Sequence, residues 1–167
     1  GTSYTDAQNT GITATATATP STICAGASTS LSVTLARSGN ATIGTGTGTN
    51  STSSAVSAWF GTWFGNGHAQ ILILASELTA AGLKAGNLTG LNIPITSTGS
   101  PTTLNNYTVK IGATSATAIT TFQAPTFTTV WGPTNFTPSV GTSSFTFTTP
   151  FNWNGTSNII IDYCYAN

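Results

Sequence analysis

The chain has 167 residues and a mass of 16.9 kDa, which suits one domain of ordinary size or one domain with a short attached hairpin. Three basic and three acidic residues make up 4% of the sequence, against about 25% charged residues in typical soluble domains, and the formal net charge is zero. This scarcity of charge argues against electrostatic binding to nucleic acid or to an anionic membrane surface.

Hydroxyl side chains replace charge as the polar component of the chain. The sequence contains 37 Thr and 18 Ser, together with four Trp, eight Phe and four Tyr. Disordered chains lack aromatic and β-branched residues, whereas here they are abundant and favour strands. The composition therefore predicts a folded, all-β protein.

The N-terminal region reads as a small β-unit. Residues 12–19 alternate between Thr and Ala after an initial Ile, which predicts a strand with one hydroxyl face. Residues 30–35 alternate again, and we expect Leu31 and Val33 to point inward. The following stretch, residues 37–54, is rich in Gly, Ser, Thr and Asn and is expected to be a connector rather than a phosphate-binding loop.

A single helical signal follows the connector. Residues 71–74 are continuously apolar and predict a buried strand. The next residues, 76–83, predict one or two helical turns, with Ser76 as the cap, Glu77 beside the positive end of the dipole and Gly82 as a left-handed stop.

The rest of the chain contains short predicted strands at regular intervals. Strands are expected at residues 88–95, 107–111, 126–131, 144–148 and 159–165, with turn residues between them. Such spacing is typical of a β-sandwich or jelly roll. We therefore divide the chain into an N-terminal β-strand segment with a linker, residues 1–41, and a β-sandwich, residues 42–167.

Cys24 and Cys164 are the two cysteines, and a disulfide between them is predicted because each lies in a strand-like apolar context. In the entropic description, closing so long a loop stabilises by roughly 4–5 kcal/mol. Two buried free thiols are the alternative, and Cys24 pairing across subunits is another. Two cysteines and the single His68 do not complete a zinc site, so neither a metal nor a cofactor is expected.

Catalytic residues are not expected either. His68 lies in a glycine-flanked loop with no acidic residue near it in sequence, so a structural role is favoured over a general base. Asp162 alternates with Ile161 and Tyr163 and is expected to face solvent. Three scattered acids provide neither the carboxylate pair of a glycosidase nor a calcium site. We therefore expect the protein not to be an enzyme.

The tryptophans allow a binding function as an alternative. Trp59 and Trp63 are possible contacts for a glycan if their rings are exposed, although filling the core is the commoner use of large aromatics. Six Asn-X-Thr/Ser motifs also occur, as a Thr-rich composition favours. No stretch is long and apolar enough to span a membrane, and residues 1–3 do not begin a signal peptide, so we expect a mature product or an excised piece.

Three stretches resemble a repeat module of giant bacterial surface proteins that use the type IX secretion route. They are residues 71–89, 105–112 and 149–164, and the resemblance covers residues 42–167. Residues 19–31 are similar to the opening strands of bacterial immunoglobulin-like repeats. Copies of the module usually continue beyond the cysteine-containing strand, and Gly1–Thr5 looks like that continuation, which suggests one period of a repeat cut out of phase.

The resemblance implies an extracellular β-sandwich on the bacterial cell surface, as a repeat or subunit of an adhesin or filament. The expected partners are copies of the chain itself and, as an alternative function, surface glycans bound by exposed aromatics. Strand donation by residues 3–19 to a neighbouring copy would join the copies, while folding of this strand onto residues 42–167 of its own chain is the competing hypothesis. An ice-binding function ranks third, because flat ice-binding faces need the Thr-X-Thr spacing on successive stacked strands and the rest of the sequence shows no such short repeat.

Overall fold

The computed structural model describes residues 12–37, 39–44, 59–60, 65–98 and 103–166. The chain divides into two compact units, Gly1–Thr42 and Ile43–Asn167.

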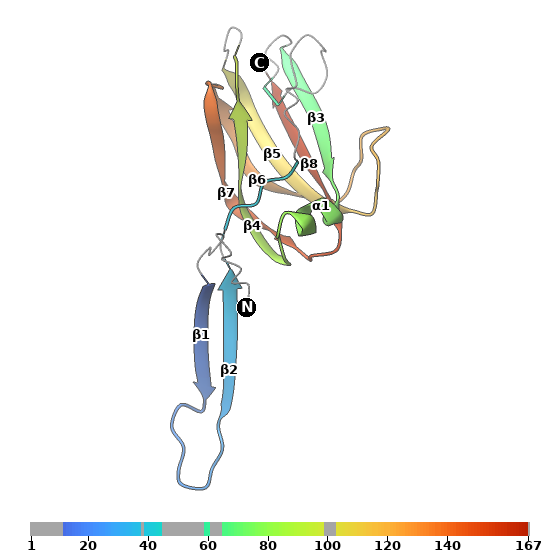
Figure 1. Ribbon diagram of the computed structural model, residues 1–167. Helices are drawn as coiled ribbons and strands as arrows, with labels where there is room; N and C mark the ends of the chain where they lie inside the picture. Colours follow the sequence, from blue (N-terminus) through green and yellow to red (C-terminus); the bar gives the residue numbers. More distant parts are fainter. Residues whose placement is uncertain (1–11, 38, 45–58, 61–64, 99–102, 167) are drawn as a thin grey trace, which may run out of the picture. The chain divides into compact units, whose positions relative to one another are not determined.

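The first unit contains an antiparallel hairpin of β1 (Ile12–Thr19) and β2 (Ser30–Arg37), drawn in blue in Figure 1. The register pairs Ala16 with Val33 and Thr17 with Ser32, so apolar and hydroxyl residues fall on opposite faces. On the hydroxyl face, the Thr17 and Ser32 side-chain oxygens lie 2.7 Å apart. The predicted N-terminal hairpin is confirmed.

The apolar face of the hairpin does not point into a core, contrary to our expectation. The side chains of Leu31 and Val33 are 77% and 64% exposed. Their neighbours across the register, Ala18 and Ala16, are too small to shield them. In the described part of the chain, β1 and β2 form a sheet of two strands, which leaves this face uncovered.

The second unit is a β-sandwich, and the predicted all-β fold is confirmed (Figure 1). Its elements are β3 (Asn66–Ile73), α1 (Ala75–Ala80), β4 (Gly86–Ile95), β5 (Leu104–Thr114), β6 (Phe127–Phe136), β7 (Gly141–Trp153) and β8 (Asn158–Ala166). The larger sheet has the strand order β3-β8-β5-β6, and β4 pairs with β7 in the smaller one. The last strand therefore lies inside the larger sheet, between β3 and β5.

The short helix forms where it was predicted, but its cap is different. It begins at Ala75 rather than after Ser76, and the Leu74 backbone N–H donates to the Glu77 carboxylate at 2.7 Å. The Ala75 N–H donates to the Asn158 side-chain oxygen, also at 2.7 Å. Gly82 has a φ of 89°, as expected for the left-handed stop. None of the described helical residues forms a segment that could span a membrane.

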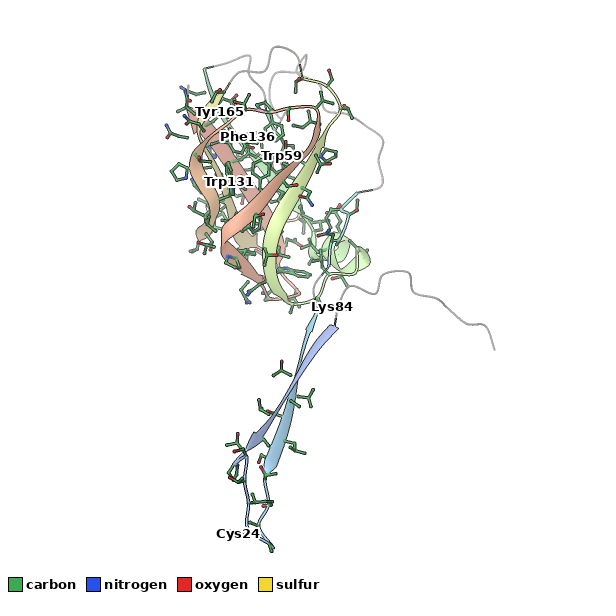
Figure 2. The ribbon with its side chains drawn as sticks, turned by 90° about the vertical axis from the view of Figure 1, so that its left-hand side faces the viewer. Cys24, Trp59, Lys84, Trp131, Phe136 and Tyr165 are labelled. Atoms are coloured by element: carbon green, nitrogen blue, oxygen red, sulfur yellow. The ribbon has the colours of Figure 1, made fainter. Side chains whose placement is uncertain are left out.

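Aromatic rings fill one part of the core between the two sheets. Tyr107 of β5 is fully buried, and its ring lies near those of Phe60, Phe136, Phe145 and Tyr163. Figure 2 shows Trp59, Trp131, Phe136 and Tyr165 gathered in the same region. Because aromatic side chains bury large areas and prefer offset or edge contacts, this cluster contributes much of the sandwich's stability.

A glycine on β3 lets one of these rings lie flat against the sheet. Gly67 pairs with Tyr165 of β8, and a Cβ atom at Gly67 would collide with the Tyr165 ring. An aromatic ring over a cross-strand glycine shields the backbone that the glycine exposes. Gly67 is therefore needed for close packing rather than for an unusual backbone angle.

The buried tyrosines make the stability of the sandwich sensitive to alkaline pH. Burial, followed by the charge of Tyr165, raises the pKa of Tyr163 to about 12, and burial also raises the pKa of Tyr107 and Tyr165. An unfolded tyrosine titrates near pH 10, so above this pH the native state binds more protons than the unfolded state. The free energy of unfolding is therefore expected to fall as the pH rises from about 10 to about 12.

Denaturant titrations at pH 9, 10 and 11 check this expectation, with Tyr163→Phe as the comparison variant. The variant retains the ring and removes the ionisable hydroxyl, so its stability should fall less steeply between pH 10 and pH 11. Identical slopes for the two proteins would show that Tyr163 does not cause the alkaline loss.

Candidate functional site

A polar cluster lies on the outer face of the larger sheet, where sequence analysis predicted no site. It consists of His68 and Gln70 from β3, Lys110 from β5 and Asp162 from β8, and we call it the Asp162 cluster. The strand register explains how it forms, since Asp162 pairs directly with Gln70 on one side and with Lys110 on the other. Residues that pair directly across strands place their side chains on the same face.

Asp162 is the centre of the cluster. One carboxylate oxygen, Oδ2, lies 2.7 Å from His68 Nε2 and accepts a hydrogen bond from Gln70 Nε2 at 2.9 Å. The other oxygen, Oδ1, lies 3.8 Å from the Lys110 ammonium. The Asp162 side chain is 4% exposed, while those of His68 and Lys110 are 50% and 35% exposed. The buried carboxylate is thus compensated by partners that extend to solvent.

The loop between β5 and β6 buries this carboxylate. The Gln123 backbone N–H donates to the Gln70 side-chain oxygen at 2.7 Å, and Gln70 Nε2 donates back to the Gln123 carbonyl at 2.8 Å. The Phe122 ring stacks on His68 with centroids 4.4 Å apart. The prediction that Asp162 faces solvent is therefore wrong. Strand alternation places its side chain on the face of β8 that points away from the core, but the loop between β5 and β6 covers that face.

An open groove lies beside the cluster, at the Asn66 end of β3 and the Ala166 end of β8. It has a volume of about 480 Å³, and its lining includes His68, Lys110 and Cys164. Cys164 pairs with His68 on β3 and with Thr108 on β5, and it is partly exposed. The groove therefore gives access to a thiol near the side chains of His68 and Lys110.

The contacts of the Asp162 cluster are typical of a structural site that holds a loop in place. A carboxylate bonded to an imidazole fixes the ring orientation, as in catalytic triads, but a triad also needs a nucleophile within hydrogen-bond reach of the ring. Here the nitrogen Nε2 contacts the carboxylate and the Phe122 ring covers a face of the imidazole. These contacts tie the loop between β5 and β6 to the sheet.

The two cysteines are both free thiols in the structure, so the predicted disulfide between Cys24 and Cys164 is not formed there. Cys24 is exposed and belongs to the first unit, whereas Cys164 belongs to the second. The pairing of these residues stays a prediction.

Of the two possible glycan contacts, the structure describes Trp59, which is half-buried. The Trp59 ring stacks on Tyr163 with centroids 4.6 Å apart and packs against the core. Its carbonyl accepts a hydrogen bond from the Tyr107 hydroxyl at 3.2 Å. Trp63 lies outside the described residues. Among the residues that the structure describes, no group of three or more His, Cys, Asp or Glu side chains is arranged to hold a metal ion.

The sequence contained one usable signal for the Asp162 cluster. Alternation in β8 places Asp162 and Cys164 on the same face, opposite Tyr163. Sequence reasoning missed the contact between His68 and Asp162, which lie 94 positions apart in the sequence. Strand register across such separations is not encoded in any local pattern.

Comparisons with protein families, with curated proteins and with solved structures find no match to this chain. The resemblance to type IX surface modules therefore stays a prediction.

The Asp162 cluster is expected to stabilise the sandwich through the loop that it anchors. Asp162→Ala removes the acceptor of the partly buried Gln70 amide, and an unmatched buried donor costs about 1–3 kcal/mol. The value should lie toward the lower end, because His68 and Lys110 can be hydrated. Asp162→Asn keeps the shape and one acceptor oxygen, so it should lose less.

Chemical denaturation of the three proteins measures these losses, and hydrogen exchange at the Gln123 amide reports on the loop. Exchange there should be faster in Asp162→Ala than in Asp162→Asn. Unchanged stability and exchange in the alanine variant would contradict the bracing role.

Proposed function

We propose that the protein is a structural and adhesive subunit, or repeat, of an extracellular bacterial fibre or cell-surface adhesin, and that its copies join through the N-terminal hairpin. The observation that carries this proposal is the exposed apolar face of β1 and β2. Leu31 and Val33 are 77% and 64% exposed on a sheet of two strands.

A two-stranded hairpin is at best marginally stable alone in water. Pairing with a third strand would satisfy backbone groups at its edge, and packing would cover its apolar face. The unit donated in this proposal is the whole hairpin. Residues 12–19 of the expected donor strand pair with β2, so the proposed donor unit includes both strands.

The edge strand β3 is the acceptor that fits best. It ends the larger sheet, and in the described part of the chain it pairs with β8 alone. It has eight residues, as do both strands of the hairpin. Ala69 and Ile71 of β3 pack against the core, so Leu31 and Val33 of a donated hairpin would extend the same apolar layer.

Such an interface joins two different surfaces, so each copy could accept one neighbour and be accepted by another. Contacts of this heterologous kind produce open fibres rather than closed dimers. The scarcity of charged residues supports a contact made of main-chain hydrogen bonds and apolar packing. Glycan binding through Trp59 has less support, because that ring stacks on Tyr163.

Deletion of residues 1–37 tests this function. The remaining sandwich has its own core, so it should keep its circular dichroism and thermal transition while losing the ability to assemble in sedimentation experiments. Loss of the fold itself would contradict donation, since it would show that the hairpin belongs to its own sandwich.

A double substitution in the full chain isolates the apolar face. Leu31→Thr with Val33→Thr keeps β-branched or strand-favouring residues and removes the apolar surface, and it should weaken assembly at least tenfold. Ser32→Thr on the opposite face is the matched control and should assemble like the unaltered chain. Equal assembly of all three proteins would show that the apolar face is not the contact.

A further inference from the structure

We propose that Cys24 in the hairpin of one copy forms a disulfide with Cys164 in the groove of the next copy. This inference rests on the proposed function and specifies how a donated hairpin would be locked in place. Its starting observations are that both cysteines are free and that each is accessible in its own unit.

Cys24 is presented by the loop that joins the two hairpin strands. Figure 2 shows it at the end of the hairpin. A turn closes this loop, in which the Ala27 N–H donates to the Cys24 carbonyl at 3.0 Å. Neighbouring Ile23 is 48% exposed, and no residue from 20 to 29 is charged. The loop therefore offers a thiol and an apolar side chain without a charge that would need to be desolvated.

Cys164 is accessible because the loop between β5 and β6 does not cover it. That loop contacts Gln70 of β3 and Asn158 of β8, and Asp162 is buried. Cys164 lies farther along β8 on the same face and lines the groove of about 480 Å³.

The dimensions of the hairpin bring the two sites together. Eight extended residues span about 26 Å, and β3 has the same number of residues. A hairpin that pairs along β3 therefore runs its full length, and antiparallel pairing of β1 with β3 would place its loop at the Asn66 end. The groove lies at the Asn66 end of β3, and the strand that carries Cys164 is the immediate neighbour of β3.

The remaining sideways distance is short enough for the loop to cross. Adjacent strands lie about 4.8 Å apart, so a hairpin strand beside β3 lies about 10 Å from β8. Residues 20–29 connect the hairpin strands and are long enough to bend over one strand. Because the donated hairpin lies on the neighbouring copy, the Cys164 within its reach belongs to that copy.

Formation of the bond requires an oxidant, and a dissolved disulfide such as oxidised glutathione is sufficient. The Cys164 thiolate attacks one glutathione sulfur, forms a mixed disulfide and releases one glutathione thiolate. The Cys24 thiolate of the donor copy then attacks the Cys164 sulfur and releases the second glutathione. Two protein thiols are oxidised, and one glutathione disulfide is reduced to two thiols.

Complementary single-cysteine variants test the link. The unaltered chain, Cys24→Ser, Cys164→Ser and an equal mixture of the two variants are incubated with oxidised and reduced glutathione and separated on non-reducing denaturing gels. The unaltered chain should give a ladder of covalent oligomers. Each variant alone should remain a monomer, and the mixture should give one dimer whose peptide map contains a Cys24–Cys164 bond.

Several results would overturn the proposal. They are an oxidised monomer of the unaltered chain with an internal disulfide, dimers of either variant alone, or no covalent product in the mixture. Sedimentation of the unaltered chain in reductant separates this failure from failure of the proposed function. Assembly without a covalent product would remove the disulfide link and leave hairpin donation in place, whereas absence of assembly would remove both.

Discussion

The sandwich depends on β8, the last strand, being packed on both faces in the interior of the larger sheet. On one face, Ile159 and Tyr163 are almost fully buried in the core. On the other face, Ile160 is fully buried and Asp162 is 3% exposed. Backbone pairing with β3 and β5 completes the environment of the strand. The fold therefore requires that β8 lies between β3 and β5, two strands that come much earlier in the sequence.

The two faces of β8 carry different kinds of side chain because they pack against different residues. The core face meets aromatic rings, and burial among them raises the pKa of Tyr163. The outer face carries a carboxylate, whose burial is tolerated because Gln70 and His68 donate to it and Lys110 lies nearby. Two of the six charged residues, Lys110 and Asp162, are used at this one place. Little charge remains to steer an encounter with another protein.

Alternation and turn residues were sufficient to predict the sandwich, most of its strands and the short helix, although His68, which was assigned to a loop, lies on β3 (Asn66–Ile73). They were insufficient for contacts that depend on register. The hairpin of β1 and β2 was predicted, but Leu31 and Val33 were wrongly expected to face a core, because the hairpin has no third strand in the described region. The cap of α1 was misassigned because Asn158, far away in the sequence, supplies one acceptor.

The Asp162 cluster was not predicted for the same reason, since its contacts depend on strand register. Local alternation placed Asp162 away from the core but could not show that residues of the loop between β5 and β6 pack over it. Trp59 was considered as a possible glycan contact, with core filling as the favoured use, and its ring stacks on Tyr163 of β8. Neither the covering loop nor the stacked partner lies close in sequence to the residue that it contacts.

We propose that copies of this chain associate through backbone pairing and apolar packing rather than through charge. Sedimentation velocity of the full chain in reductant, over a hundredfold range of protein concentration at 50 mM and 1 M NaCl, tests it most directly. We expect oligomers that grow with concentration and whose dissociation constant changes less than about threefold between the two salt concentrations, since salt screens only charge interactions. A monomer at every concentration, or an association lost in 1 M NaCl, would contradict it.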